Sequence, residues 1–240
     1  MKDYAVVVCL HGDELFGLEV IDKISKEIPI FIGNPKAIEH KTRSIDSDLN
    51  RVFPGNPFGD EEEKRAFFLL EKLKDFKYII DIHSSSGDTD LFGIITQFSK
   101  EKINLVQKLG LSKLVIMPSN LASGKALIDH VSCGISLEVG PHEKKEIVDE
   151  VMGALNNINE EHSSNREPLI IYQVIDIIYG EDNANPFMIN FKEVKKGDLI
   201  AKGNKEYFAE KDFIPIFVNE KSYKNILCLA TKIITPEELI

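Results

Sequence analysis

The stretch Tyr78-Ile79-Ile80-Asp81-Ile82-His83 decides the fold of this 240-residue chain. Its apolar residues form a short, almost continuous run, which is typical of a strand that is buried in a sheet. Two polar residues that suit a metal site, Asp81 and His83, occupy its end. Because they are two residues apart, their side chains point to the same face of the strand. The stretch therefore predicts a buried strand of an α/β sheet with functional side chains near its carboxyl end.

Two other stretches have the same design. Val6-Val7-Val8-Cys9-Leu10 leads into His11, and Gly134-Ile135-Ser136-Leu137 leads into Glu138. In an open α/β sheet, ligands bind outside the carboxyl ends of the parallel strands. We therefore expect His11, His83 and Glu138 to meet at one edge of the sheet.

The rest of the first 165 residues alternates between strand-like and helix-like segments. Apolar spacing predicts helices at 15–24, 60–76, 101–109 and 143–160, and strands at 29–32, 93–96 and 114–117. This alternation predicts an α/β fold with a mixed, largely parallel sheet flanked by helices. Residues 33–58 show little periodicity and are predicted to be a long loop, which in a compact domain is usually functional or disordered.

The pattern changes near residue 165. From there on, short β-like runs at 169–178, 199–201, 213–218 and 226–234 are separated by turns. We predict two domains, a catalytic domain at 1–165 and a small β-rich C-terminal domain at 166–240.

Composition limits the classes of function. The chain is 43% hydrophobic and 28% charged, which is ordinary for a soluble globular protein, and it contains no transmembrane or signal-peptide pattern. Its net charge of −10 disfavours nucleic acid as a partner, whereas a few well-placed arginines can still bind a small anion. Cys9, Cys133 and Cys228 lie in apolar runs without a CxxC pair, which predicts buried, reduced thiols and a cytoplasmic protein.

His11, Glu14 and His83 have the chemistry of a catalytic zinc site. Structural zinc sites are usually closed and rich in cysteine, whereas catalytic sites carry three N or O ligands and one open position. Asp81 can orient His83 by accepting a hydrogen bond from it. Each residue alone has an ordinary structural explanation; Glu14, for example, suits the first turn of a helix. The joint pattern favours the metal site.

Three further polar groups accompany these ligands. Glu138 lies in an otherwise apolar strand, where it is either a general base or a carboxylate bonded to a nearby turn. Arg43 and Arg51 flank Asn50 in the 33–58 segment. Arginine binds carboxylates through paired hydrogen bonds, although solvated loop arginines are the simpler alternative.

Together these blocks resemble a known family. The motifs are His11-Gly12-x-Glu14, Arg43-x₄-Asp48-Leu49-Asn50-Arg51-x-Phe53, Asp81-x-His83 and Glu138-Val139-Gly140-Pro141. Their order and spacing are similar to those of the aspartoacylase/succinylglutamate desuccinylase family, within the zinc carboxypeptidase-like hydrolases. Phe217-Val218-Asn219-Glu220-x-x-Tyr223 resembles the aspartoacylase C-terminal domain, so the resemblance spans nearly the whole chain.

The resemblance implies a zinc-dependent amidohydrolase, or deacylase, that cleaves the amide of a small carboxylate-bearing N-acyl amino acid. One zinc ion per chain would be bound by His11, Glu14 and His83, and a zinc-bound water would attack the amide. Glu138 would act as general acid and base, and Arg43 would stabilise the oxyanion.

The resemblance also implies how substrate binds. Asn50 and Arg51 would hold its carboxylate, and Tyr223 would reach into the pocket from the C-terminal domain. This chain has Ser84-Ser85-Ser86 where aspartoacylases have an asparagine and threonines. Ile128 replaces a family arginine, with Lys125 as the nearest basic residue and a candidate substrate-binding cation. These departures leave open which acyl group and which amino acid are recognised.

Two alternative functions remain at this point. The same core supports a zinc carboxypeptidase that acts on a peptide-like substrate, which an open groove would favour. A non-catalytic, metal-binding regulatory protein would have lost a ligand or the general base, and the sequence retains all of them. The partner predicted from sequence is a small-molecule substrate, with no nucleic acid and no membrane, and a homodimer is left open.

Overall fold

The computed structural model describes residues 2–122, 124–141, 143–144, 146–159, 168–235 and 238. The regular elements of the first half are β1 (Lys2–Val8), α1 (Phe16–Lys23), β2 (Ile30–Ile32), α2 (Pro35–His40), the 3₁₀ helix η1 (Leu49–Arg51), α3 (Glu61–Leu73), β3 (Phe76–Ser84) and β4 (Thr89–Ile95). Those that follow are α4 (Lys100–Lys108), β5 (Lys113–Ile116), the 3₁₀ helices η2 (Ser119–Ala122) and η3 (Leu127–Asp129), β6 (Cys133–Gly140), α5 (Ile147–Asn156) and the 3₁₀ helix η4 (Asn157–Asn159). The C-terminal part contains β7 (Ile170–Tyr179), β8 (Asn185–Pro186), β9 (Leu199–Lys202), β10 (Glu206–Phe208), β11 (Ile214–Ile216) and β12 (Ile226–Ile234).

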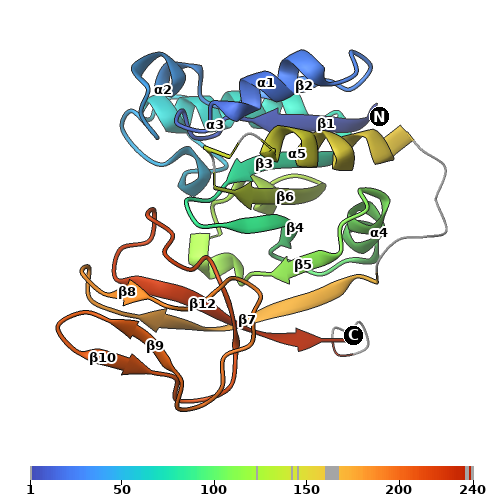
Figure 1. Ribbon diagram of the computed structural model, residues 1–240. Helices are drawn as coiled ribbons and strands as arrows, with labels where there is room; N and C mark the ends of the chain where they lie inside the picture. Colours follow the sequence, from blue (N-terminus) through green and yellow to red (C-terminus); the bar gives the residue numbers. More distant parts are fainter. Residues whose placement is uncertain are drawn as a thin grey trace.

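A nine-stranded sheet runs through the molecule in the order β11-β12-β7-β5-β4-β6-β3-β1-β2 (Figure 1). The pairs β1–β2, β1–β3, β3–β6, β4–β5 and β5–β7 are parallel. The pairs β4–β6, β7–β12 and β11–β12 are antiparallel. The predicted α/β fold with a mixed, largely parallel sheet is therefore confirmed.

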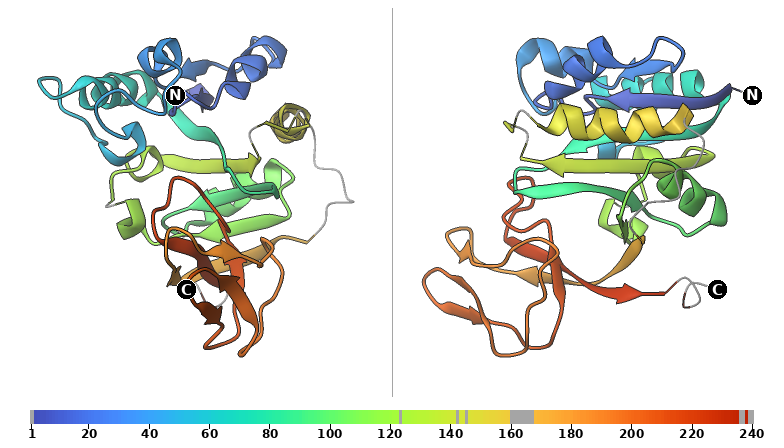
Figure 2. Two further views of the ribbon diagram at one scale, coloured as in Figure 1. Left: turned by 60° about the vertical axis from the view of Figure 1, so that its left-hand side comes forward. Right: turned by 45° about the vertical axis from the view of Figure 1, so that its right-hand side comes forward.

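Helices cover both faces of the β1–β3–β6 part of the sheet, with α5 on one side and α3 on the other (Figure 2). Alternate residues of β1 supply the two cores. Val6 and Val8 belong to the same apolar cluster as residues of α1 and α5, whereas Ala5 and Val7 belong to the cluster that includes α3. Because both faces are covered, the central residues of β1, β3 and β6 are mostly apolar, and the polar residues Asp81, His83 and Glu138 lie toward the carboxyl ends of β3 and β6.

The prediction that residues 33–58 form one long loop is wrong in two places, where the chain forms short helices. The chain forms α2 at Pro35–His40, where the Asn34 side chain accepts a hydrogen bond from the Ala37 N–H. It forms η1 at Leu49–Arg51, where the Asp48 side chain accepts from the Asn50 N–H. Both helices are too short to show a hydrophobic period, so their caps were the available signal.

The C-terminal strands belong to two sheets. β7, β12 and β11 extend the large sheet, whereas β8, β9 and β10 form a separate three-stranded antiparallel sheet. β8 and β10 have only two and three residues and were not predicted. The predicted domain boundary at 165/166 lies outside the described residues, and the division into two domains stays a prediction.

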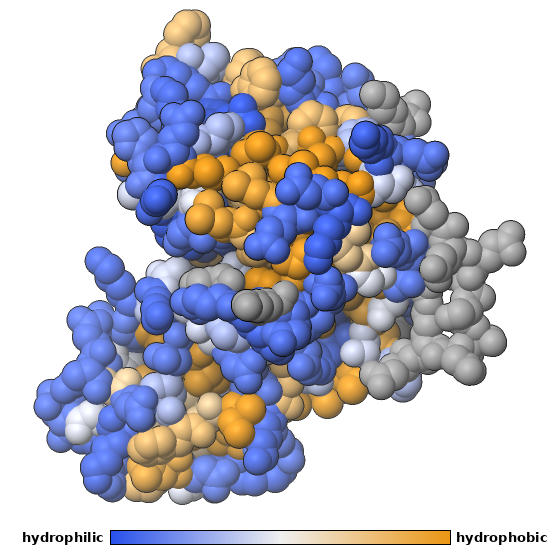
Figure 3. Space-filling view, turned by 45° about the horizontal axis from the view of Figure 1, so that its top comes forward, coloured by the Kyte–Doolittle hydropathy of each residue, from blue (hydrophilic) through white to orange (hydrophobic). Residues whose placement is uncertain are grey.

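The surface and the thiols agree with the composition. Among the described residues, no helix has both the length and the apolarity needed to cross a membrane, and on the face drawn in Figure 3 hydrophilic residues interrupt the apolar ones. Cys9, Cys133 and Cys228 are free and buried, which confirms the predicted burial of the three thiols.

Candidate metal centre and active site

The turn after β1 carries the first two candidate ligands. The Glu14 N–H donates to the His11 carbonyl over 3.2 Å, so both residues belong to a tight turn that precedes α1. A Cβ on Gly12 would lie 2.3 Å from the Ala37 carbonyl carbon and 2.5 Å from the Thr42 carbonyl oxygen. Glycine is therefore required at position 12, because the turn packs directly against the backbone of α2 and the segment after it.

The third candidate ligand comes from the carboxyl end of β3. His83 Nδ1 lies 3.3 Å and His11 Nδ1 lies 3.2 Å from the same carboxylate oxygen, Glu14 Oε1. All three residues are buried, and one ligand atom from each lies within 4.8 Å of the others. His11, Glu14 and His83, which are separated by up to 72 positions in the sequence, thus form one compact group of potential metal-ligand atoms, the donor group.

This donor group fits a metal ion. Within the described part of the chain, His11 Nδ1 and Glu14 Oε2 are buried without a hydrogen-bond partner. Buried polar atoms are nearly always satisfied, so an unpaired nitrogen and an unpaired carboxylate oxygen in this group fit a site that could hold a cation. Two histidines and one glutamate are a ligand set typical of catalytic zinc.

Two aspartates fix the orientation of the histidines. His83 Nε2 lies 2.7 Å from Asp81 Oδ2, and His11 Nε2 lies 3.2 Å from Asp48 Oδ1. When Nε2 of each histidine donates its proton to the aspartate, the lone pair of Nδ1 on the Glu14 side is available to bind a metal ion. Asp81 occupies the place that its spacing from His83 predicts.

Asp48 also holds Arg43. Its Oδ2 accepts hydrogen bonds from Arg43 Nε at 3.3 Å and from an Arg43 terminal nitrogen at 3.0 Å. Burial alone would raise the pKa of Asp48, but the hydrogen bond from His11 and the charges of His11, Arg43 and Arg51 lower it below its ordinary value. Asp48 is therefore a carboxylate that links a metal ligand to an arginine of the pocket.

Asn50 and Arg51 lie in η1, at the edge of the same site. Asn50 Oδ1 accepts a hydrogen bond from the Leu127 N–H at 2.9 Å, and its Nδ2 lies 3.2 Å from His83 Nε2. The hydrogen bond from Leu127 fixes the carbonyl end of this amide, whereas the NH2 end is only close to His83 Nε2, because that nitrogen donates its proton to Asp81. Arg51 donates to the Asn50 carbonyl at 2.8 Å.

Glu138 faces the donor group from β6. The parallel register of β3 and β6 pairs His83 directly with Glu138. Burial, together with the nearby charges of Glu14 and Glu220, outweighs the histidine charges and raises the pKa of Glu138 from 4.5 to about 8. A carboxyl group with such a pKa can exchange a proton near neutral pH.

A cavity of about 60 Å³ brings these groups together. Its lining consists of His11, Glu14, Arg43, Asn50, Arg51, His83, Ser84, Ser85, Glu138, Phe217, Glu220, Ser222 and Tyr223. Tyr223 therefore reaches the site from the C-terminal part, and burial raises the pKa of its phenol to about 12, so it stays a hydrogen-bond donor. Its ring packs edge to face against the ring of Phe217, with the two ring centroids 5.8 Å apart.

Lys125 is placed differently. Its side chain is exposed, and it is not among the residues that line the cavity. Its neighbour Ile128 is buried in an apolar cluster with Phe92. Phe217, Glu220 and Ser85 line the cavity but were not predicted as site residues, although Phe217 and Glu220 belong to the C-terminal motif.

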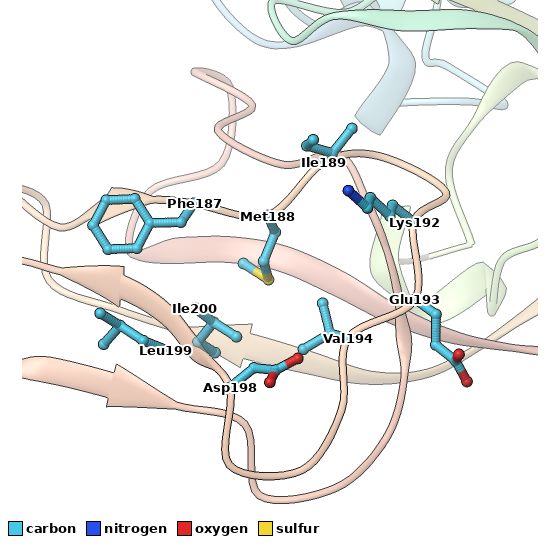
Figure 4. Close-up of a pocket in the computed structure, with 9 residues that line it drawn as sticks. All are labelled: Phe187, Met188, Ile189, Lys192, Glu193, Val194, Asp198, Leu199 and Ile200. Atoms are coloured by element: carbon cyan, nitrogen blue, oxygen red, sulfur yellow. The ribbon is translucent and has the colours of Figure 1, made fainter.

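A larger cavity, of about 310 Å³, lies in the C-terminal part (Figure 4). Six of its nine lining residues are apolar, with Met188, Val194 and Ile200 among them, and its charged residues are Lys192, Glu193 and Asp198. It contains no histidine or cysteine. The smaller cavity at the carboxyl ends of the strands therefore carries the metal-binding and acid–base groups.

Comparisons with known proteins agree with this arrangement. Residues 1–152 match the model of the succinylglutamate desuccinylase/aspartoacylase catalytic domain. A probable aspartoacylase of Prochlorococcus marinus (strain MIT 9515) is 28% identical, with 95% of this chain and 92% of the relative covered. The aspartoacylase of Xenopus tropicalis is 23% identical, with 89% of this chain and 86% of the relative covered.

The fold has known counterparts. The crystal structure of murine aminoacylase 3 superposes with a TM-score of 0.80 at 19% identity, over 97% of this chain and 95% of that one. The product-bound ectoine utilization protein EutE of Ruegeria pomeroyi gives a TM-score of 0.76 at 20% identity, over 98% of this chain and 86% of that one. Since the catalytic-domain model covers more than half of the residues, the chain belongs to the succinylglutamate desuccinylase/aspartoacylase family of hydrolases.

Proposed function

We propose that the protein is a zinc-dependent amidohydrolase that cleaves the amide of a small N-acyl amino acid with a free carboxylate. One observation carries the proposal: the buried group of His11, Glu14 and His83, with both Nδ1 atoms directed toward Glu14. The names of the relatives, aspartoacylase and succinylglutamate desuccinylase, support the class of reaction.

The three ligands would hold one zinc ion per chain. Bound there, zinc would act as a Lewis acid and lower the pKa of water at its open position. Asp48 and Asp81 would keep His11 and His83 in the tautomer that binds metal.

Glu138 and Arg43 would carry out the chemistry on the protein side. Glu138 would take the proton of the attacking water and pass it to the leaving amine. Arg43, held by Asp48, would donate to the carbonyl oxygen as negative charge develops on it. This division of roles needs one acid–base group and one cation within a single small cavity.

Arg51 would bind the substrate carboxylate. It lies in the cavity wall, where a guanidinium can pair with a carboxylate through two hydrogen bonds. Asn50 would assist by holding η1 in place, since its Oδ1 accepts a hydrogen bond from the Leu127 N–H. Tyr223 would donate to the substrate from the opposite wall.

The size of the cavity favours a small substrate over a peptide. A volume of about 60 Å³, closed on one side by Phe217 and Tyr223, is unlike the open groove that a carboxypeptidase needs. A non-catalytic metal-binding protein is disfavoured because Glu138 and the ligand set are all present and lie together.

The test of the catalytic assignment is Glu138→Gln. We expect this variant to keep its zinc and its fold but to lose about 10²–10⁴-fold in turnover, because glutamine cannot accept the proton. Glu101→Gln is the matched control, since Glu101 pairs with Lys77 on the surface. Near-normal turnover of Glu138→Gln on a good substrate would contradict the assignment.

A panel of N-acyl amino acids tests the substrate class. The carboxamide analogue of each substrate should be rejected, because it would leave Arg51 without a charged partner. Substrates with one carboxylate should be accepted, and N-acetylaspartate should be a poorer substrate, because Ile128 stands where the family has an arginine. Strong preference for N-acetylaspartate would contradict this and would point to Lys125 as the second cation.

A further inference from the structure

Residues 217–223 form a thin wall of the metal pocket. Phe217, Glu220, Ser222 and Tyr223 line the 60 Å³ cavity that contains the ligands. Glu220 and Tyr223 also line a separate cavity of about 260 Å³. Figure 2 shows the loop before β12 extending from the C-terminal strands toward the ends of β4 and β6. The same short segment therefore separates a small cavity from a larger one.

The first attachment of this wall is made by Ser86, three residues after the ligand His83. The Ser86 N–H donates to Glu220 Oε2 at 2.8 Å, and Ser86 Oγ accepts from the Lys221 N–H at 2.8 Å. The other oxygen of Glu220 accepts from the Ser222 N–H at 3.0 Å. Ser86 thus donates to Glu220 and accepts from Lys221, and these two hydrogen bonds join the loop after β3 to the wall.

The second attachment is made by Asn190. Its Oδ1 accepts from the Val218 N–H at 2.9 Å, and its Nδ2 donates to the Asp88 carbonyl at 2.8 Å. Asn190 therefore bridges the wall and the loop after β3. A Cβ on Gly87 would lie 2.6 Å from the Val218 carbonyl oxygen, so the two backbones are in direct contact there.

The wall has a backbone that needs such support. Phe217 and Asn219 have φ values of 53° and 58°. Non-glycine residues hold left-handed conformations when the surrounding structure over-determines them, and a bulky residue such as Phe217 adopts them rarely. The hydrogen bonds of Ser86 and Asn190 supply that constraint from outside the segment.

We propose that Ser86, Asn190 and Glu220 set the substrate size that the metal pocket accepts, by holding the wall with Tyr223 in place. They are positioning residues that act through Tyr223. Loosening the wall would join the pocket to the neighbouring 260 Å³ cavity and admit bulkier groups. This inference rests on the proposed function for its substrates.

The kinetic test uses Asn190→Ala and Ser86→Ala. Each should raise KM for an N-acetyl amino acid by about 3–10-fold, the effect of losing one or two hydrogen bonds, with kcat changed less than about 2-fold. The ratio of kcat/KM for the N-benzoyl to the N-acetyl substrate should rise by about tenfold. Asn157→Ala, which removes a side-chain bond to the Leu109 carbonyl away from the pocket, should leave that ratio unchanged.

A second mutation tests the route of the effect. When Tyr223 is already alanine, adding Asn190→Ala should change the ratio of kcat/KM for the N-benzoyl and N-acetyl substrates very little. Asn190 acts through the Tyr223 side chain, which this variant lacks. An undiminished effect of Asn190→Ala in that background, or an unchanged ratio in both single variants, would overturn the proposal.

Two measurements do not depend on the reaction. The amides of Val218, Lys221 and Ser222 should exchange with solvent faster in the variants than in the wild type at equal zinc content. Extraction of zinc by a bulky chelator should accelerate more than extraction by a small one. If the wild type hydrolyses no N-acyl amino acid, the proposed function fails. If the variants show the same amide exchange rates and the same rates of zinc extraction as the wild type, the role of the wall contacts is overturned, whatever the outcome of the activity assay.

Discussion

Asp48 receives hydrogen bonds from His11 and Arg43, two side chains with different roles in the proposed reaction. A shift of this carboxylate would move a metal ligand and the arginine together. Paired and hydrogen-bonded carboxylates of this kind hold neighbouring groups in a productive geometry. Arg51 is anchored separately, by the Asn50 carbonyl, so the two arginines can be tested independently.

We predict opposite kinetic effects for the two arginines. Arg43→Ala should lower kcat by roughly 10²-fold or more, because Arg43 would act on charge that develops in the transition state. Arg51→Ala should mainly raise KM, because Arg51 would bind the carboxylate equally before and during the reaction. Steady-state kinetics of both variants measure this, and an exchange of the two patterns would mean that the roles are reversed.

At the scale of elements, Glu62 of α3 orders the segment before η1. It is buried, and its two oxygens accept hydrogen bonds from the N–H groups of Ile45, Asp46 and Ser47 and from Asn34 Nδ2. Burial would raise the pKa of Glu62, but these four donors lower it below its ordinary value. The segment that carries Arg43 and Asp48 is thereby fixed to a helix.

We predict that Glu62→Gln lowers the free energy of unfolding by about 1.5–3 kcal/mol at neutral pH, the range for losing hydrogen bonds to a charged group. Since the folded pKa is depressed, the stabilisation is fully present above about pH 4.5 and is lost as the pH falls through the folded pKa. The difference in free energy of unfolding between wild type and variant, measured by urea unfolding, should therefore become smaller at acidic pH. Glu71→Gln, at an exposed position of the same helix, should change stability by less than about 0.5 kcal/mol.

At the scale of the whole molecule, the metal site joins parts of the chain that the sequence keeps far apart. His11 and Glu14 come from the turn after β1 and His83 from β3, while the supporting aspartates are the N-cap residue of η1 and a residue of β3. A ligand that binds the folded state alone stabilises the entire fold by mass action.

We predict one zinc ion per chain and a higher unfolding temperature with zinc than with a chelator. Free zinc at about 100 times Kd should add about 2.7 kcal/mol. His83→Ala should lose both the metal and this increment, whereas His40→Ala, at an exposed position in α2, should keep both. Elemental analysis and thermal unfolding check this, and equal zinc content in the two variants would contradict the ligand assignment.

Much of the fold and of the metal group was predictable from sequence, because both depend on local patterns. Apolar runs of strand length end in His11, His83 and Glu138, and the parallel strands place those ends side by side. Asp81 was predictable as a partner of His83 because a two-residue spacing puts both on one face. The short helices in 33–58 were missed because they have no hydrophobic period.

The sequence by itself determined the α/β fold, the donor types and the family, since periodicity and residue chemistry suffice for these. Only the tertiary structure decided that Asn50 Oδ1 accepts from the distant Leu127 N–H and that Lys125 lies outside the cavity lining. It also decided that Ser86 bonds with Glu220, 134 residues away, and so closes one wall of the pocket. Such contacts depend on how distant loops pack against one another, and no local pattern in the chain encodes that packing.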